Sequence, residues 1–174
     1  MKQLDFPKFM QTYEYDCGTK ALQAVLIYYG IEIREELLIK YAKTNKKEGT
    51  LIKGILRTLK KYKLKFNDGQ LSIKDLKDNI DKKIPTILLL QAWNPKKIDY
   101  TNSYRDGHWV VAVGYTKDKI IFEDPYFSIC TFLTNKELEK RWHGQEKVKQ
   151  IKNYGIVVYG KNPTYDSKKI IHMD

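Results

Sequence analysis

The sequence contains little cysteine and no long apolar stretch. Its two cysteines, Cys17 and Cys130, are too few for the disulfide framework of a small secreted domain, although a single bridge between them stays open. No apolar run approaches the roughly 20 residues of a membrane-spanning helix. The first twenty residues carry acidic side chains and lack the apolar core of a signal peptide. These absences predict a cytoplasmic protein with no membrane span.

Internal repeats, low-complexity tracts and linkers rich in Pro, Gly or Ser are also absent. The hydrophobic fraction of 42% and the aromatic fraction of 13% are typical of a globular protein. A chain of 174 residues is long enough to bury a core of its own. We therefore expect one domain over residues 1–174, with a helical lobe at about 8–82 and a β lobe at about 84–160.

The chain is strongly basic. Lys and Arg number 32 against 21 Asp and Glu, a net charge of +11, which favours acidic partners in general. Nucleic acid is one interpretation, but the lysines are spread along the chain, and the sequence motifs of nucleic-acid-binding folds are absent. A solvated basic surface is the favoured interpretation, and we expect no specific nucleic-acid partner.

Apolar residues recur at helical spacing in the first half of the chain. The pattern predicts four helices, which begin at Cys17, near Leu37, after Thr50 and at Ile73. Asp16, Thr50 and Ser72 precede three of these helices, and we expect their side chains to cap them. Gly30 is the expected stop of the first helix.

After Pro85 the pattern changes to continuous apolar runs, which are typical of buried strands. We expect strands over residues 86–90, 108–115, 119–123 and 155–159. Residues 116–118 form a tight connection that predicts a hairpin between the second and third strands. An order of helices first and antiparallel strands after them is typical of the α+β class, which we therefore expect.

Cys17 lies at the expected start of the first helix. A cysteine reacts as a thiolate, and a helix N-terminus stabilises that anion through its unpaired N–H groups and its dipole. A buried structural cysteine is the alternative interpretation. Asp16 is either a helix cap or a modulator of the thiolate, and the cap is favoured because a neighbouring carboxylate opposes thiolate formation.

His108 and Asp124 are the candidate partners of Cys17. His108 opens a strand and Asp124 follows the end of its hairpin partner, so the two lie side by side if residues 116–118 form the turn. A neutral imidazole there can take the thiol proton and later protonate the leaving amine, while a carboxylate holds its other nitrogen. The alternatives are a hydrogen-bonded histidine at a strand edge and an Asp-Pro turn.

Gln11 precedes Cys17 by six residues. Its side-chain amide can donate to the oxyanion of a tetrahedral intermediate, beside the backbone N–H of Cys17. A solvated glutamine in a polar loop is the alternative interpretation.

These segments together resemble a known family. The string QTYEYDCGTKALQAVLIYYG, which contains Gln11 and Cys17, resembles the active-site segment of the papain-like cysteine peptidases that head bacteriocin-exporting ABC transporters. GHWVVAVGY at 107–115 and EDPY at 123–126 are similar to the histidine and aspartate segments of that family, and Gly49-Thr50 also fits. The resemblance covers roughly residues 8 to 127 and implies a papain-like fold.

The resemblance also implies cleavage of peptide bonds, after a double glycine in a leader in the transporter-linked members. Carried over by position, Gln11 matches the oxyanion glutamine and Cys17 the nucleophile. His108 matches the general base and Asp124 the orienting acid. No transporter segment follows in this sequence, so we expect the peptidase domain to stand alone here. The stretch 93–107, between the first strand and the histidine strand, is longer and more polar than such a connection needs to be. A loop there is expected to border the site.

The leading hypothesis is a cysteine peptidase that acts on a peptide or protein segment. Acyl transfer or isopeptide hydrolysis on the same residues is a second option, and a peptide-binding module without turnover is a third. His143 and His172 lack a second ligand at metal spacing, so neither a metal nor another cofactor is expected. A separate transporter is a candidate partner of this protein.

Overall fold

The computed structural model describes residues 1–96 and 98–173. Most of its strands form one antiparallel sheet, made of β1 (Lys2–Gln3), β2 (Lys65–Gln70), β3 (Thr86–Gln91), β4 (Gly107–Tyr115), β5 (Lys119–Glu123), β6 (Thr131–Thr134) and β9 (Tyr154–Tyr159). The order across this sheet is β2-β9-β3-β4-β5-β6, and β1 pairs with β4. A separate hairpin consists of β7 (His143–Glu146) and β8 (Lys149–Lys152).

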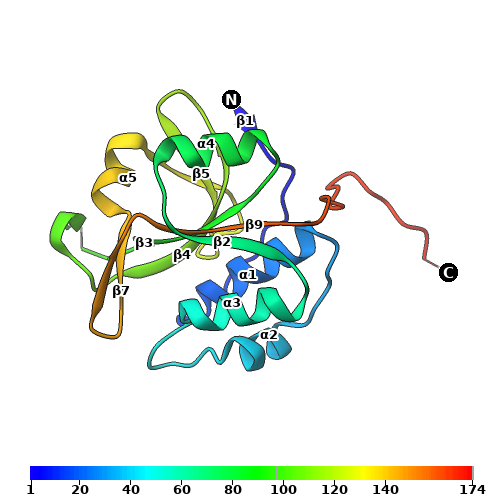
Figure 1. The fold of residues 1–174 in the computed structure, drawn as a ribbon, viewed down its shortest axis with the longest axis horizontal. Helices are drawn as coiled ribbons and strands as arrows, with labels where there is room; N and C mark the ends of the chain where they lie inside the picture. Colours follow the sequence, from blue (N-terminus) through cyan, green and yellow to red (C-terminus); the bar gives the residue numbers. More distant parts are fainter. Residues whose placement is uncertain (97, 174) are drawn as a thin grey trace.

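The helices cover both faces of the sheet. They are α1 (Cys17–Tyr28), α2 (Glu35–Ala42), α3 (Ile52–Lys61), α4 (Ile73–Asp81) and α5 (Asn135–Arg141), with a short 3-10 helix η1 (Tyr100–Asn102). In Figure 1, α1, α2 and α3 gather on one side of the sheet, and α4 and α5 lie on the other side. Both α1 and α4 pack against β4, which is therefore enclosed from two directions.

Helix α1 is the central helix of the fold. All of its residues except Ile27 are buried, and it contacts β4, α2 and α3. Leu22 and Leu26 are fully buried, and each such side chain stabilises a fold by about 1.5–3 kcal/mol. Because α1 is enclosed by its neighbours, its first residue, Cys17, is held in a fixed position.

The predicted α+β class is confirmed. The four predicted helices correspond to α1 to α4, and the four predicted strands correspond to β3, β4, β5 and β9. The turn at residues 116–118 does join β4 and β5, and the Thr116 N–H donates to the Lys119 carbonyl at 3.0 Å.

Two of the predicted helix caps can be compared directly. Ser72 caps α4 in a reciprocal capping box with Asp75, as predicted. The prediction for Asp16 is wrong, because its side chain makes no cap hydrogen bond although it occupies the N-cap position of α1. Its Oδ2 instead accepts from the backbone N–H groups of Thr12 and Tyr13, both at 3.2 Å. The carboxylate is turned toward the preceding loop, because the backbone N–H groups of that loop need a hydrogen-bond acceptor.

The predicted cap of the third helix is also wrong. Leu51 is the N-cap residue of α3, and its side chain makes no cap hydrogen bond. The Thr50 hydroxyl lies in a buried cluster instead, 3.2 Å from the hydroxyl of Thr19. The first N–H of α3, from Ile52, donates to Glu146 Oε1 at 2.6 Å. A distant residue on β7 therefore takes the place of the local cap.

Several elements lie outside the sequence prediction, namely β1, β2, β6, β7, β8 and α5. β2 falls within the range expected for the helical lobe, yet all six of its residues pair with β9. Its side chains are mostly polar and exposed because it forms an edge of the sheet. An edge strand of this kind lacks the apolar run that identifies a buried strand.

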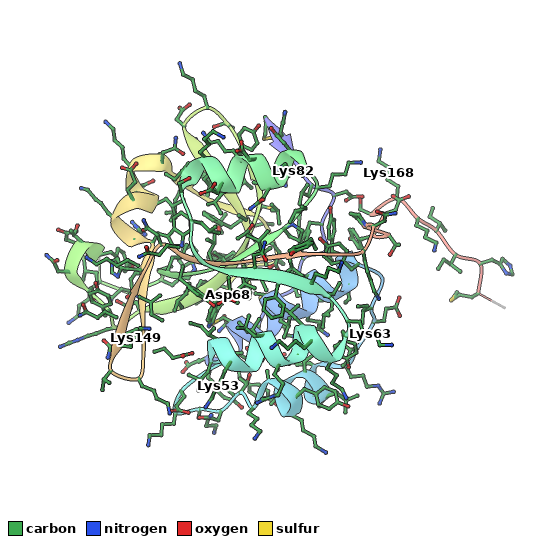
Figure 2. The ribbon with its side chains drawn as sticks, viewed as in Figure 1. Lys53, Lys63, Asp68, Lys82, Lys149 and Lys168 are labelled. Atoms are coloured by element: carbon green, nitrogen blue, oxygen red, sulfur yellow. The ribbon has the colours of Figure 1, made fainter. Side chains whose placement is uncertain are left out.

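The positive charge is spread over the molecule. Figure 2 shows Lys53 on α3, Lys82 after α4, Lys149 on β8 and Lys168 in the C-terminal segment, projecting from different parts of the surface. This distribution agrees with a solvated basic surface. Within residues 1–96 and 98–173, every helix is too short or too polar to cross a membrane.

Candidate active site

Cys17 opens α1 and lines a cleft of about 370 Å³. The residues that line the cleft include Gly49 and Thr50, which precede α3, and Gly107 and Trp109 of β4. The Trp109 indole N–H donates to the Thr50 carbonyl at 3.0 Å and so joins these two segments. The first residue of α1 therefore lines a cleft to which β4 also contributes.

Gly18 allows this close approach of helix and sheet. A Cβ atom at this position would lie 2.6 Å from Thr50 Cβ and 2.7 Å from Trp109 Cδ1, closer than real atoms pack. The glycine after the cysteine is therefore required by packing, and it fixes the depth at which Cys17 is held.

The hairpin of β4 and β5 brings His108 and Asp124 together. Val111 pairs with Glu123 in the register of the hairpin, so Asp124, the next residue, lies opposite Val110. His108 is two residues from Val110 and shares its face of the sheet. His108 Nε2 and Asp124 Oδ1 are 2.7 Å apart, and both side chains are buried. The predicted proximity of these two residues is confirmed.

Asp124 is held by four hydrogen-bond donors. Oδ1 accepts from His108 and from the Tyr126 backbone N–H at 2.9 Å. Oδ2 accepts from the Trp93 indole at 3.1 Å and from the Thr131 hydroxyl at 3.0 Å. Burial alone would raise the pKa of Asp124, but the bonds from His108, Tyr126 and Thr131, that of His108 foremost, lower the pKa below its ordinary value. The carboxylate is therefore ionised at neutral pH.

His108 contacts both Asp124 and Cys17. Burial works to lower the pKa of His108, but hydrogen bonds to Asp124 and Cys17 outweigh it and raise the pKa to about 10. Because Nε2 is bonded to Asp124, Nδ1 is the ring nitrogen left for Cys17. The imidazole is therefore protonated at neutral pH, whereas the sequence led us to expect a neutral one. An imidazolium opposite Cys17 is the natural partner of a thiolate.

Gln11 lies next to this group. Its backbone N–H donates to the Pro125 carbonyl at 2.7 Å, directly after Asp124. Its side-chain Nε2 donates to the Tyr13 carbonyl at 3.0 Å, and its buried Oε1 has no hydrogen-bond partner among the residues that the structure describes. One of the two amide protons is therefore engaged within the loop, and the oxyanion role of Gln11 stays a prediction.

The buried Asp16, which precedes Cys17, and the half-buried Glu35 form a carboxyl pair. Burial first, and then the hydrogen bond with Glu35, raise the pKa of Asp16 to about 6. Lys20 forms an ion pair with Glu35 at 2.8 Å. This cluster holds the loop before α1, because Thr12 donates its hydroxyl to Glu35 at 2.8 Å.

Trp93 and Thr131 were missed by sequence reasoning as partners of Asp124. The only sequence indication was the long polar stretch at 93–107, which was expected to border the site. That expectation is confirmed by the bond from Trp93 to Asp124. Thr131 opens the edge strand β6, which carries no apolar run to reveal it.

The remaining candidates lie away from this group. Cys130 and Cys17 are both free, so the single bridge between them is absent. His143 Nε2 faces the backbone carbonyls of Tyr100 and Lys140. Over residues 1–96 and 98–173, His, Cys, Asp and Glu side chains form no group of three that could hold a metal ion.

Solved structures share this fold. The peptidase domain of Streptococcus ComA, described as a bi-functional ABC transporter involved in a quorum sensing pathway, is 22% identical with a TM-score of 0.67, and the match covers 88% of this chain and 97% of that one. A double glycine motif protease from an AMS/PCAT transporter, solved with its leader peptide, is 17% identical over 94% and 95% of the two chains, with a TM-score of 0.66.

A C39-like peptidase from Bacillus anthracis is 16% identical over 93% of this chain and 99% of that one, with a TM-score of 0.68. A search of curated proteins found no match. These structures confirm the papain-like fold that the sequence predicted. The family model of the peptidase C39 family matches residues 5–146, which is most of the sequence. The chain therefore belongs to the peptidase C39 family.

Proposed function

We propose that this protein is a cysteine peptidase that hydrolyses a peptide bond with Cys17, His108 and Asp124. The observation that carries the proposal is the placement of His108, which bonds to Asp124 at 2.7 Å and has Cys17 as its other partner. Membership of the peptidase C39 family supports the same reaction.

The reaction begins with the Cys17 thiolate. Its sulfur attacks the carbonyl carbon of the scissile bond, and the carbonyl electron pair moves to oxygen. The tetrahedral intermediate collapses as the C–N bond breaks, and His108 gives its proton to the leaving amine. Water then attacks the thioester, His108 takes up a proton from that water, and the C–S bond breaks to restore the thiolate. Asp124 keeps the ring oriented throughout.

The developing oxyanion needs hydrogen-bond donors. In our proposal these are the backbone N–H of Cys17, at the N-terminus of α1, and the Gln11 Nε2 group. Gln11 uses one amide proton for Tyr13, which leaves its second proton for the oxyanion.

The substrate that we propose has small residues before the scissile bond, as in a double-glycine leader. The cleft beside Cys17 is lined by two glycines, Gly49 and Gly107, together with Leu89 and Trp109. Such a channel favours residues without bulky side chains. The AMS/PCAT protease, which shares the fold, is described as a double glycine motif protease bound to a leader peptide.

We extend the proposal to the setting of the reaction. ComA and the AMS/PCAT protein are described as transporters. In our proposal this chain likewise associates with a transporter, at the cytoplasmic side where the leader peptide is presented. Co-purification with a membrane fraction that contains such a transporter, and its loss after the transporter is removed, is the test.

A peptide-binding module without turnover is the second candidate function. One observation favours it: the Gln11 amide is already bonded to the Tyr13 carbonyl and does not lie free in the cleft. Transfer of the acyl group to an amine in place of water would use the same residues and forms the third candidate.

The deciding experiment uses an irreversible thiol-reactive peptide that ends in Gly-Gly, followed by cleavage assays on a library of leader-like peptides. We expect labelling at Cys17, and we expect Cys17→Ala and His108→Ala to abolish cleavage while the peptide still binds. Cys130→Ala is the matched control and should cleave normally. Binding without any cleavage by the parent protein would favour the module.

A further inference from the structure

The loop between β3 and β4 carries Trp93 to Asp124. The Trp93 indole N–H donates to Asp124 Oδ2 at 3.1 Å, while Asp124 Oδ1 is bonded to His108 at 2.7 Å. The indole therefore touches the far oxygen of the carboxylate that orients His108. Trp93 belongs to the stretch 93–107, which is longer and more polar than the connection expected from the family resemblance.

The conformation of Trp93 is unusual. Its backbone φ is 63°, in the left-handed region that bulky residues rarely adopt. Its ring stacks on Tyr126 with centroids 5.0 Å apart and planes at 9°, and it meets the edge of Phe127 at 4.9 Å. A strained residue of this kind persists where its surroundings hold it, and such residues cluster at functional sites.

The loop is anchored at several points. The Ala92 N–H donates to the Asp106 carbonyl at 3.1 Å, and the Asn94 side chain donates to both oxygens of the Asp106 carboxylate at 3.0 Å. The Asn94 N–H donates to the Tyr100 hydroxyl at 2.9 Å. The Arg141 guanidinium of α5 lies 4.4 Å from the Tyr100 ring. These contacts fix the base and the crest of the loop, and they hold the strained Trp93 in place.

We propose that Trp93 is a positioning residue, whose indole N–H fixes the orientation of Asp124 and thereby holds His108 against Cys17. A carboxylate bonded at Oδ2 by Trp93 and Thr131 cannot rotate, so Oδ1 stays aimed at the imidazole. The inference rests on the proposed function, because it assigns Trp93 a role in that same group of residues.

The alternative is that Trp93 only packs against Tyr126 and Phe127. Trp93→Phe separates the two roles, because phenylalanine keeps the aromatic stack and removes the N–H donor. Trp93 is 39% exposed, so the substitution leaves no large buried cavity. Thr131→Val is the second variant, since it removes the other donor to the same oxygen with little change in shape.

The readout is the pH profile of peptide cleavage between pH 5 and pH 11, whose alkaline limb reports loss of the His108 proton that the leaving amine needs. A loosened Asp124 stabilises the imidazolium less, so the pKa of His108 falls. We expect the alkaline limb of the Trp93→Phe profile to move down by about one pH unit, and cleavage to fall about tenfold. Thr131→Val should move the limb in the same direction.

Other charged groups lie near the pair and need their own measurement. Glu123 precedes Asp124 and has a pKa raised to about 8 by burial, and Arg141 lines a small cavity behind Asp124. The Trp93→Phe profile is therefore repeated with Glu123→Gln in the background, and the shift should be the same. A shift that vanishes there belongs to Glu123 and overturns the proposal.

Two controls complete the test. Trp142→Phe removes another indole N–H, which donates to the Tyr154 carbonyl at 2.9 Å away from the site, and should leave the pH profile unchanged. With Asp124→Ala in the background, Trp93→Phe should have no further effect, because Trp93 acts through Asp124. If Asp124→Ala itself leaves the profile unchanged, the proposed function and this inference both fail. If Asp124→Ala shifts the profile and Trp93→Phe does not, only the positioning role is overturned.

Discussion

The two cysteines of this chain have the same chemistry and very different surroundings. Cys17 stands at a helix N-terminus with a protonated His108 as its partner. Cys130 is half buried beside Gln3 and Glu123, and burial raises the pKa of its thiol. Reactivity at the residue scale is therefore set by the immediate neighbours of the sulfur.

Iodoacetamide should accordingly distinguish the two thiols. We expect Cys17 to be alkylated about tenfold or more faster than Cys130 at pH 7, because Cys17 stands at a helix N-terminus beside His108 whereas burial raises the pKa of Cys130. Mass spectrometry of the native protein measures both rates, and Cys130→Ala should leave the rate at Cys17 unchanged. Equal rates at the two positions would contradict the proposed nucleophile.

Gln11 provides the second prediction at this scale. Gln11→Ala should leave peptide binding nearly unchanged and slow cleavage about 100- to 1000-fold, because an oxyanion exists only in the transition state. Gln145, which lines the cleft beside Cys17 and bonds to the Lys147 carbonyl, is the matched control. If Gln11→Ala cleaves at the parental rate, Gln11 does not stabilise the oxyanion and is only a residue of the loop.

At the scale of the element, the end of β5 places two carboxyl groups in succession. Asp124 faces His108 and is ionised, whereas Glu123 is buried and accepts only the Phe9 N–H, at 3.1 Å. Burial raises the pKa of Glu123 from its ordinary 4.5 to about 8. Neighbours on one strand therefore occupy opposite protonation states, because alternate residues face different environments.

This difference gives a pH dependence of stability. The raised pKa means that the folded state binds the Glu123 proton more tightly than the unfolded state does, so stability falls as pH rises from about 4.5 to about 8. Glu123→Gln keeps the acceptor and removes the titration. At pH 9 we expect this variant to be more stable than the parent by on the order of 5 kcal/mol, with little difference at pH 4.

Chemical denaturation at the two pH values measures the effect. Glu36→Gln, on an exposed face of α2, is the control and should alter stability equally at both. If the free energy of unfolding depends on pH in the same way in the parent and in Glu123→Gln, the carboxyl group of Glu123 does not titrate as we expect.

The start of α1 gives another prediction at the element scale. Gly18→Ala should destabilise the fold by about 1–3 kcal/mol and slow cleavage, because the added methyl group collides with Thr50 and Trp109 and displaces Cys17. Gly107→Ala is the stability control, since the nearest atom to its added Cβ is 3.8 Å away. Thermal unfolding of both variants measures the difference, and an equally stable Gly18→Ala would show that the helix can shift without cost.

At the scale of the whole molecule, the site joins residues that are distant in sequence. Cys17 comes from the helical side, His108 and Asp124 come from one hairpin, and Trp93 comes from the loop before that hairpin. The division into a helical and a β lobe within one domain stays a prediction, and β2 is a strand of the main sheet within the expected helical range.

The sequence by itself determined the elements that bury apolar side chains. Helices α1 to α4 and strands β3, β4, β5 and β9 were predictable because burial imposes a regular spacing on apolar residues. It also determined that His108 and Asp124 lie at the same end of the hairpin of β4 and β5. A β-bulge between Ala112 and Gly114 shifts the register of this hairpin, so the tertiary structure decided that the two side chains share one face.

Only the tertiary structure decided the features that depend on a distant partner. Glu146 of β7 replaces the local cap of α3, and the polar edge strand β2 is defined by its pairing with β9. Trp93 reaches Asp124 because an anchored loop holds an unfavourable backbone angle. Such contacts do not appear in the spacing of apolar residues along the sequence. A single hydrogen bond between distant segments constrains one residue and does not affect the apolar pattern of its neighbours.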